Sequence, residues 1–312
     1  MQSQMEHNTS KVVITGGCGF IFSHVVDYFL NKGWEVVVLD DLSKGSHPEL
    51  LKEWGEEENF KFYQQDCAEL STQDLIIREE PDYIIHASAI SDVDFSIKDP
   101  EFTLTQNILS TINVFEAARH LPKLKKLLVV STDEVYGECE VKKSEEDIIF
   151  PKNPYAVTKA FNSLLRIGYD NTYLTIKDKT CETRFCNVFG ERQDERKVLA
   201  RIKKSLEEDT LIPVQNGGKG YREYMYVKNI PPVIDLLLEK GDRVYNITTN
   251  NGYTVEELIK KCEESTGKVA RTTEAHRPGM DMKYQMDNTR IKELGWTPLF
   301  TFEEGLNDYL NK

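Results

Sequence analysis

The stretch Val12–His24, VVITGGCGFIFSH, decides the fold of this chain. An apolar run at 11–15 leads directly into a glycine-rich turn, and a helical pattern begins behind it, which is how a dinucleotide phosphate loop starts. Gly16 and Gly19 hold the first two positions of the motif, but Phe22 stands where a third glycine lets the helix pack closely on the strand. We expect an intact loop, with the helix displaced or the ring turned into a local gap. The alternative is loss of cofactor binding.

Short apolar runs alternate with helical patterns through the first 190 residues. Strand, helix, strand repeated in this way predicts a parallel sheet with helices on both faces, an α/β fold of the doubly wound Rossmann type. The carboxyl ends of its strands then share one edge, where ligands bind. The predicted strands are 11–15, 35–40, 60–66, 83–89 and 126–132, and the predicted helices among them are 19–31, 100–120 and 154–170.

The pattern loosens after about residue 185. Loops rich in glycine and charge follow, separated by helices near 195–208, 254–266 and 288–295. We therefore predict two domains. An NAD-binding Rossmann domain spans 1–185, and a smaller, mainly substrate-binding α/β lobe spans 186–312, with about 222–245 returning to the first domain.

Composition restricts the class of protein. The 312 residues carry a net charge of -13 at pH 7, which argues against a nucleic-acid partner. No apolar run approaches a membrane span, and the polar stretch MQSQMEHNTS lacks a signal core, so we predict a cytoplasmic protein with no membrane partner. The 6 cysteines form no CxxC pair and have no histidine at zinc spacing, which predicts reduced thiols and no metal site.

An acidic residue at the end of the second predicted strand points to the cofactor. Asp40 stands where a carboxylate accepts the ribose hydroxyls of an adenosine and repels a 2′-phosphate. NAD is therefore favoured over NADP, although Lys44 keeps NADP open. Asp66 ends the third strand, where it would either meet the adenine amino group or serve only as a turn residue.

A second group of polar residues lies further along the same sheet edge. The segment VVSTDEVYGE closes the fifth strand, and NPYAVTKA opens the helix after it. Tyr155 and Lys159 are four residues apart, so they share one helix face. A nearby ammonium lowers the pKa of a phenol, which makes Tyr155 a candidate base at neutral pH. Asp133 and Glu134 follow the strand directly, and two carboxyls in different environments can divide acid and base roles.

These motifs together resemble the extended short-chain dehydrogenase/reductase family of nucleotide-sugar enzymes, most closely its dTDP-glucose 4,6-dehydratase branch. TGGCGFIFSH is similar to the family's TGGAGFIGSH, and STDEVYG matches the dehydratase signature. RFCNVFGERQ, GGKGYREYMYVKNI and HRPGMDMKY resemble three later family motifs, so the resemblance covers essentially the whole chain. It implies an NAD-dependent hydro-lyase that recycles its cofactor and converts a nucleotide hexose to the 4-keto-6-deoxy sugar.

The resemblance assigns a role to each catalytic residue. Oxidation at C4 acidifies the C5 proton, which Glu134 removes while Asp133 protonates the departing C6 hydroxyl. Thr132 orients the C4 hydroxyl and Tyr155, with Lys159, takes its proton. The cofactor contacts implied are Gly16, Gly19, Phe20, Ile21, Asp40, Asp66, Cys67, Ala87, Tyr155 and Lys159. The substrate contacts implied are Ser91, Asn187, Arg222 and Arg277.

Departures from the family pattern leave several alternatives open. Ile90 replaces a glutamate and Asp92 a histidine in the loop that borders the sugar, so a 2-acetamido sugar competes with glucose as the substrate. Glu223, Asn229 and Met280 also depart, at positions near the nucleotide. Two further alternatives stay open: whether the nucleotide is dTDP or UDP, and whether the reaction inverts C5.

A 4-epimerase and a non-catalytic dinucleotide-binding regulator are the competing functions. The family usually dimerises through the helices near 100–120 and 154–170, which implies a homodimer.

Overall fold

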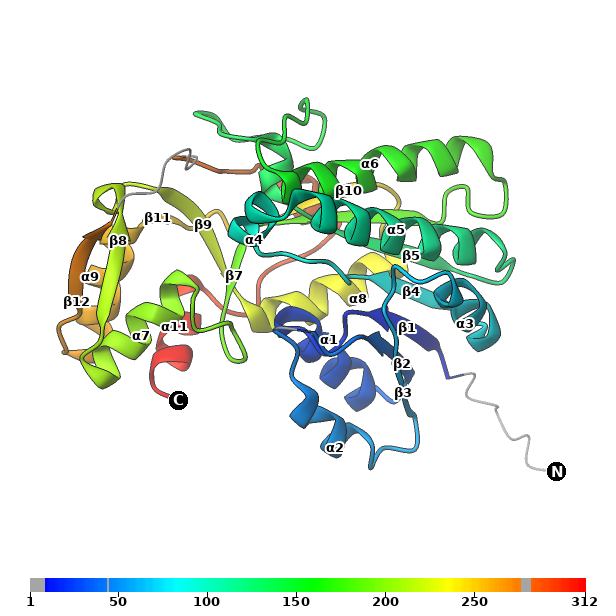
Figure 1. Ribbon diagram of the computed structural model, residues 1–312, viewed down its shortest axis with the longest axis horizontal. Helices are drawn as coiled ribbons and strands as arrows, with labels where there is room; N and C mark the ends of the chain where they lie inside the picture. Colours follow the sequence, from blue (N-terminus) through cyan, green and yellow to red (C-terminus); the bar gives the residue numbers. More distant parts are fainter. Residues whose placement is uncertain (1–8, 44, 276–281) are drawn as a thin grey trace.

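A seven-stranded parallel sheet forms the centre of the protein. The computed structural model describes residues 9–43, 45–275 and 282–312, and Figure 1 shows the chain. The strand order is β10-β6-β5-β4-β1-β2-β3. The direction in which successive strands are added reverses at β1, so β1 and β4 meet at the topological switch point, which is where ligands bind in sheets of this kind. The strands are β1 (Lys11–Thr15), β2 (Glu35–Asp40), β3 (Phe60–Gln64), β4 (Tyr83–His86), β5 (Lys126–Thr132), β6 (Thr180–Phe185) and β10 (Val244–Ile247).

Helices cover both faces of this sheet because successive strand residues point to opposite sides. Val12 and Ile14 belong to the core beneath α1 (Phe20–Asn31) and α8 (Ile230–Lys240). Val13 belongs to the core on the other face. Figure 1 shows α1 and α8 on one side of the sheet and the long helices on the other. Those are α3 (Ser71–Glu79), α5 (Pro100–Arg119) and α6 (Pro154–Thr172), and short helices lie at α2 (Leu51–Trp54) and α4 (Val93–Lys98).

The C-terminal part of the chain builds a smaller group of strands and helices beside the sheet (Figure 1). Three strands pair in the order β11-β9-β7, and β12 pairs with β8 in parallel. The strands are β7 (Asn187–Phe189), β8 (Leu211–Gln215), β9 (Tyr221–Tyr226), β11 (Gly252–Thr254) and β12 (Arg271–Ala275). The helices are α7 (Val198–Glu208), α9 (Val255–Thr266), α10 (Thr289–Glu293) and α11 (Phe302–Leu310).

The predicted fold class is confirmed. All five predicted strands form, and β3 and β4 end two and three residues before their predicted limits. The prediction did not include β6 or β10 as strands, although β10 pairs with β6 at the edge of the large sheet. The proposed division at residue 185 stays a prediction. Within the described ranges, no helix combines the length and the apolar character that crossing a bilayer requires.

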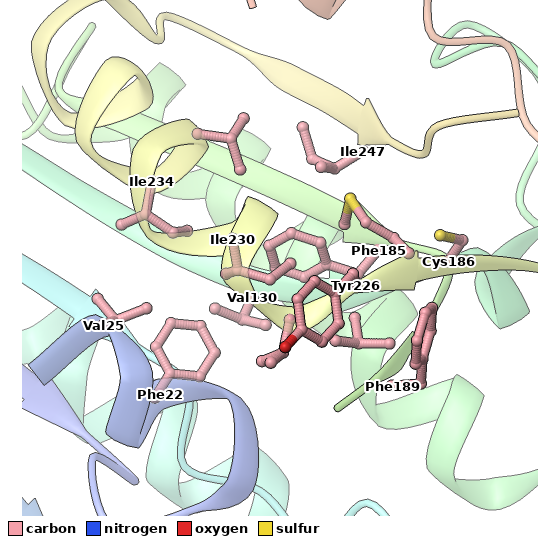
Figure 2. Packing of buried hydrophobic residues seen from close by; sticks show 14 of the residues in the cluster. Phe22, Val25, Val130, Phe185, Cys186, Phe189, Tyr226, Ile230, Ile234 and Ile247 are labelled. Atoms are coloured by element: carbon pink, nitrogen blue, oxygen red, sulfur yellow. The ribbon is translucent and has the colours of Figure 1, made fainter. Parts of the chain in front are cut away.

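Phe22 lies in the core between the first helix and the rest of the domain. The residue is 5% exposed and belongs to the same apolar cluster as Val25, Val130 and Ile230. Figure 2 shows its ring on the side of α1 that faces α8. The ring therefore fills space that α8 and β5 also border, and α1 still begins directly after the glycine turn.

Candidate active site

The glycine turn makes a cradle that larger residues could not form. Gly16 has φ of 70°, and a Cβ built on it would lie 2.8 Å from Ser88 Cα. A Cβ on Gly19 would lie 3.2 Å from the carbonyl oxygen of Gly16. Gly19 also caps α1, and no described side chain caps this helix end. Phe20 and Ile21 open the helix, so their amides belong to the helix terminus that attracts phosphate.

Asp40 joins the glycine turn to the loop after β2. Its Oδ2 accepts a hydrogen bond from the amide of Cys18 at 2.9 Å. Its Oδ1 accepts from the amide of Leu42 and from the hydroxyl of Ser46, each at 2.9 Å. Burial raises the pKa of this carboxyl, while these three donors oppose the rise. The cradle and a carboxylate at the end of β2 fit NAD: the glycine turn would hold the pyrophosphate, and Asp40 would accept the ribose hydroxyls.

The remaining predicted cofactor residues lie at neighbouring strand ends. Asp66 follows β3, and its Oδ1 accepts from the amide of Ala68 at 2.8 Å, as in a turn. Cys67 is buried, and burial raises the pKa of its thiol to about 12. The amide of Ala87 donates to the carbonyl oxygen of Thr15 at 3.2 Å, which places the loop after β4 beside the end of β1. Asp66 therefore has a turn role, and its contact with the adenine amino group stays a prediction.

The predicted catalytic turn, η2 (Asp133–Tyr136), directly continues β5. Thr132 Oγ1 donates to Asp133 Oδ1 at 3.1 Å. Asp133 is 4% exposed. Burial raises its pKa to about 7, the charge of Glu134 adds to the rise, and Arg222 opposes it. Asp133 is therefore a carboxyl that is about half protonated at neutral pH, so it can donate a proton as a general acid.

Asn153 is a site residue that the sequence analysis missed. Its Nδ2 donates to Glu134 Oε2 at 2.8 Å. Its side-chain oxygen accepts from the amide of Ala156 at 2.8 Å, so Asn153 is also the N-cap of α6. The signal in the sequence is an asparagine directly before the proline that opens a helix. One side chain thus fixes both the start of α6 and the orientation of the Glu134 carboxylate.

Tyr155 and Lys159 are both buried on α6 and turned toward the end of β5. Lys159 Nζ donates to the carbonyl oxygen of Val130 at 3.0 Å, and burial lowers its pKa to about 8. Burial, with the charges of Glu134 and Asp133, raises the pKa of Tyr155, and the hydroxyl of Thr132 opposes that rise. This direction corrects the expectation that Lys159 lowers the pKa of Tyr155. Desolvation of the phenol is the largest cause of this rise, and the ammonium of Lys159 is held by the carbonyl oxygen of Val130.

The predicted substrate residues are only partly brought together. Arg222, on β9, donates to the carbonyl oxygen of Tyr221 at 2.8 Å and stacks 4.3 Å from the ring centroid of Tyr284. Its charge lowers the pKa of Asp133, so it lies close to the catalytic turn. Asn187 opens β7, and Ser91 is exposed after β4. Arg277, like Lys44 and Met280, lies outside the described residues.

Asp92 caps α4 and forms an ion pair with Arg196, a residue that the sequence analysis did not single out. Its Oδ1 accepts from the amide of Phe95 at 3.1 Å, and its Oδ2 lies 2.8 Å from Arg196 Nη1. Arg196 belongs to the loop before α7. This ion pair connects the loop after β4 with the segment that leads into the smaller group of strands.

Comparison with known proteins gives the family of this chain. Residues 13–309 match the family model described as GDP-mannose 4,6 dehydratase. The low-salt glycan biosynthesis protein Agl12 of Haloferax volcanii is 34% identical over 95% of this chain and 96% of its own length. The dTDP-D-glucose 4,6-dehydratase of Homo sapiens is 30% identical over 95% of this chain and 87% of its own length. The chain spans 46% of the trifunctional plant relative RHM1 of Arabidopsis thaliana, at 31% identity over 96% of this chain.

Solved structures agree with this assignment. DesIV, a dTDP-glucose 4,6-dehydratase from Streptomyces venezuelae solved with NAD, has a TM-score of 0.89 at 28% identity, covering 96% of each chain. A UDP-glucose 4-epimerase from Thermotoga maritima has a TM-score of 0.89 at 30% identity, covering 96% of this chain and 97% of its own. The predicted resemblance is thus confirmed, and the NAD bound in DesIV supports NAD as the cofactor. The chain belongs to the GDP-mannose 4,6-dehydratase family, among the extended short-chain dehydrogenase/reductase enzymes of nucleotide sugars.

Proposed function

We propose that this protein is an NAD-dependent nucleotide-sugar 4,6-dehydratase, a hydro-lyase. The observation that carries the proposal is the pair of adjacent carboxyls at the end of β5. Asp133 is buried with a pKa raised to about 7, while the carboxylate of Glu134 accepts a hydrogen bond from Asn153. The two groups differ in environment, which is what separate acid and base roles require.

Residues of the turn η2 and of α6 carry out different proton transfers of the reaction. NAD, when bound, supplies the oxidising centre that takes hydride from sugar C4 and later returns it to C6. Tyr155 takes the proton of the C4 hydroxyl, which Thr132 orients, and Lys159 fixes the position of α6 on β5. Glu134 then removes the C5 proton, which the new C4 ketone has made acidic. Asp133 gives its proton to the C6 hydroxyl, which leaves as water, and the protonated Glu134 returns a proton to C5 when C6 receives the hydride.

The relatives narrow the substrate to a nucleotide hexose, with dTDP-glucose and UDP-glucose as the first candidates. Arg222 suits the diphosphate, because a guanidinium donates two parallel hydrogen bonds to phosphate oxygens. Ile90, in place of a family glutamate, would accept the methyl group of a 2-acetamido sugar. Comparing wild type with Ile90→Glu on UDP-glucose and UDP-N-acetylglucosamine tests this role of Ile90, and an unchanged preference removes the idea that Ile90 selects a 2-acetamido sugar.

The decisive experiment is mass spectrometry of the products from separate incubations with dTDP-glucose, UDP-glucose, UDP-N-acetylglucosamine and GDP-mannose. We expect one of these to lose one water. Asp133→Asn is the matched control, since it keeps the shape of the side chain and removes the acid. Bound NAD without any loss of water from the four substrates would overturn the dehydratase proposal.

A 4-epimerase is the second candidate, because a UDP-glucose 4-epimerase shares this fold at a TM-score of 0.89. An epimerase leaves the mass of the sugar unchanged, so chromatography of the C4 epimers would detect it where mass spectrometry finds nothing. A non-catalytic regulator would show neither reaction. An enzyme is favoured over a regulator because the chain retains all five predicted catalytic residues, which are Thr132, Asp133, Glu134, Tyr155 and Lys159.

We also propose that the protein works as a homodimer in the cytoplasm. The outer sides of α5 and α6 support the dimer, because they expose apolar side chains that a second copy would cover. Leu164 is 61% exposed and Ile167 is 49% exposed, and Phe102, Leu109 and Val157 are also exposed. Light scattering of wild type and Leu164→Glu tests the dimer, and a wild-type monomer at micromolar concentration would contradict it.

A further inference from the structure

A buried arginine lies against the turn η2 and has no role in the mechanism above. Arg184, on β6, is 4% exposed, and all three of its guanidinium nitrogens donate hydrogen bonds. Its Nε donates to Glu182 Oε1 at 3.1 Å, its Nη1 to Tyr136 Oη at 2.7 Å, and its Nη2 to Ser163 Oγ at 3.3 Å. The guanidinium carbon also lies 4.9 Å from the ring centroid of Tyr136. Burying a charge is costly even when it is paired, so this arrangement calls for a reason.

Two of these partners belong to the elements that carry the predicted catalytic residues. Tyr136 is the last residue of η2, and Asp133 is its first. Ser163 lies on α6 four residues after Lys159, so the two side chains share one face of the helix. Arg184 therefore joins the end of the turn to the face of α6 on which Lys159 lies.

The hydrogen bonds around the phenol of Tyr136 run in one direction only. A guanidinium can only donate, so Tyr136 Oη accepts from Arg184 and gives its own proton to Asn246 Oδ1, on β10, at 2.8 Å. Asn246 Nδ2 donates in turn to the carbonyl oxygens of Lys143 and Asp287, at 2.9 and 3.2 Å. The phenol is therefore held from two sides, by β6 and by β10.

Other contacts hold α6 and the start of the turn independently of this phenol. Asn153 donates to the carboxylate of Glu134 at 2.8 Å, and Lys159 donates to the carbonyl oxygen of Val130 at 3.0 Å. Neither contact includes the side chain of Tyr136. Loss of the phenol oxygen would therefore release the end of the turn while α6 stays attached to β5.

We propose that Arg184 and Tyr136 are positioning residues that hold the turn η2 at a fixed separation from α6. The inference rests on the proposed dehydratase reaction. In that reaction, oxidation at C4 uses Tyr155 on α6, whereas elimination of water uses Asp133 and Glu134 in the turn. Both steps act on one sugar ring, so the groups on the two elements must keep their places to within about 0.5 Å. Arg184 and Tyr136 act through the turn and not on the sugar, because their polar atoms bond to protein groups.

Tyr136→Phe separates the two steps of the reaction, because it removes one buried oxygen and keeps the ring. Stopped-flow absorbance at 340 nm follows both steps, since it rises when hydride leaves C4 and falls when hydride returns to C6 after elimination. We expect the rise to keep its wild-type rate. The fall should slow about 10- to 100-fold, which is the cost of a small misplacement of reacting groups. The affinity for NAD, measured by calorimetry, should not change.

Tyr245→Phe is the matched control. Tyr245, on β10, is 2% exposed and donates its phenol proton to Asp242 Oδ1 at 2.7 Å, so this variant also loses a buried phenol hydrogen bond. Asp242 belongs neither to the turn nor to α6, and we expect both rates to match those of wild type. In Tyr136→Phe, equal slowing of the rise and the fall overturns the proposal, and so does a fall at the wild-type rate.

Hydrogen–deuterium exchange adds a readout that needs no substrate. In the NAD-bound protein, we expect the peptide that covers η2 to exchange faster in Tyr136→Phe and to be unchanged in Tyr245→Phe. Unchanged exchange at η2 in Tyr136→Phe overturns the proposal, whether or not any substrate loses water. Faster exchange with no water loss by wild type refutes the dehydratase reaction and leaves the positioning of the turn supported.

A second variant covers the case in which Tyr136→Phe does not fold. Ser163→Ala then replaces it, since it removes the contact of Arg184 with α6. The same selective slowing of the fall in absorbance is expected, to a smaller extent. No slowing in Ser163→Ala overturns the proposal.

Discussion

The side-chain amide of Asn153 donates to the carboxylate of Glu134 at 2.8 Å while its oxygen caps α6. Asn153→Asp separates these two functions, because aspartate caps a helix as well as asparagine does. We expect Asn153→Asp to lose activity about tenfold or more, since a hydrogen bond to a charged group contributes about 1.5–3 kcal/mol. Urea unfolding should show a smaller loss of stability than in Asn153→Ala, which loses a cap of about 1 kcal/mol. Full activity in Asn153→Asp would remove this role.

Glu134→Gln tests the assignment of the base. The amide keeps a similar shape but cannot remove the C5 proton, so water loss should fall about 100- to 10,000-fold. Oxidation at C4 does not use this residue, so absorbance at 340 nm after substrate addition should still rise. Loss of both signals would place Glu134 in substrate binding instead of proton transfer.

The raised pKa of Asp133 has an effect on stability as well as on activity. The folded protein holds this proton up to about pH 7, whereas the unfolded chain releases it near its ordinary value of 3.8. Stability therefore falls as pH rises between these two values, because the folded state binds more protons. Asp133→Asn removes this effect, so its melting temperature relative to wild type should increase from pH 5 to pH 8. A constant difference across that range would show that Asp133 is ionised in the folded protein.

Phe22→Ala tests whether the unusual residue serves packing or cofactor binding. Removing a buried phenylalanine ring costs about 3–5 kcal/mol of unfolding free energy, because a cavity is left behind. Titration calorimetry should show nearly unchanged NAD affinity below the unfolding temperature, since the glycine cradle does not include the ring. A large loss of NAD affinity with little loss of stability would reverse the interpretation.

Asp40→Asn tests the preference for NAD. The amide cannot accept two ribose hydroxyls as a carboxylate does, so NAD affinity should fall about 10- to 100-fold. NADP affinity should fall less or rise, because the repulsion of the 2′-phosphate is gone. The ratio of the two dissociation constants from calorimetry is the measurement, and an unchanged ratio would exclude Asp40 from the ribose site.

Local sequence patterns predict the strands, the glycine turn and the carboxyl pair because each depends on residues close together in the chain. The missed features depend on distant segments. Arg196 meets Asp92 across 104 positions of sequence, and Arg184 meets Tyr136 across 48. The raised pKa of Tyr155 was missed for the same reason, since it results from burial by the folded chain. Asn153 is the exception, because its position before a helix-opening proline is a local signal.

The pairing of β10 with β6 has a consequence for how the protein can be divided. The chain leaves the large sheet after β6, builds β7, β8, β9 and α8, and returns at β10 in parallel register with Val244 opposite Glu182. A fragment ending at residue 185 would therefore expose the edge of β6 and lose α8 from one face of the sheet. Separate expression of the two halves should give fragments that aggregate or require co-expression, and a circular permutant that keeps both strands would be the better tool for studying the cofactor half.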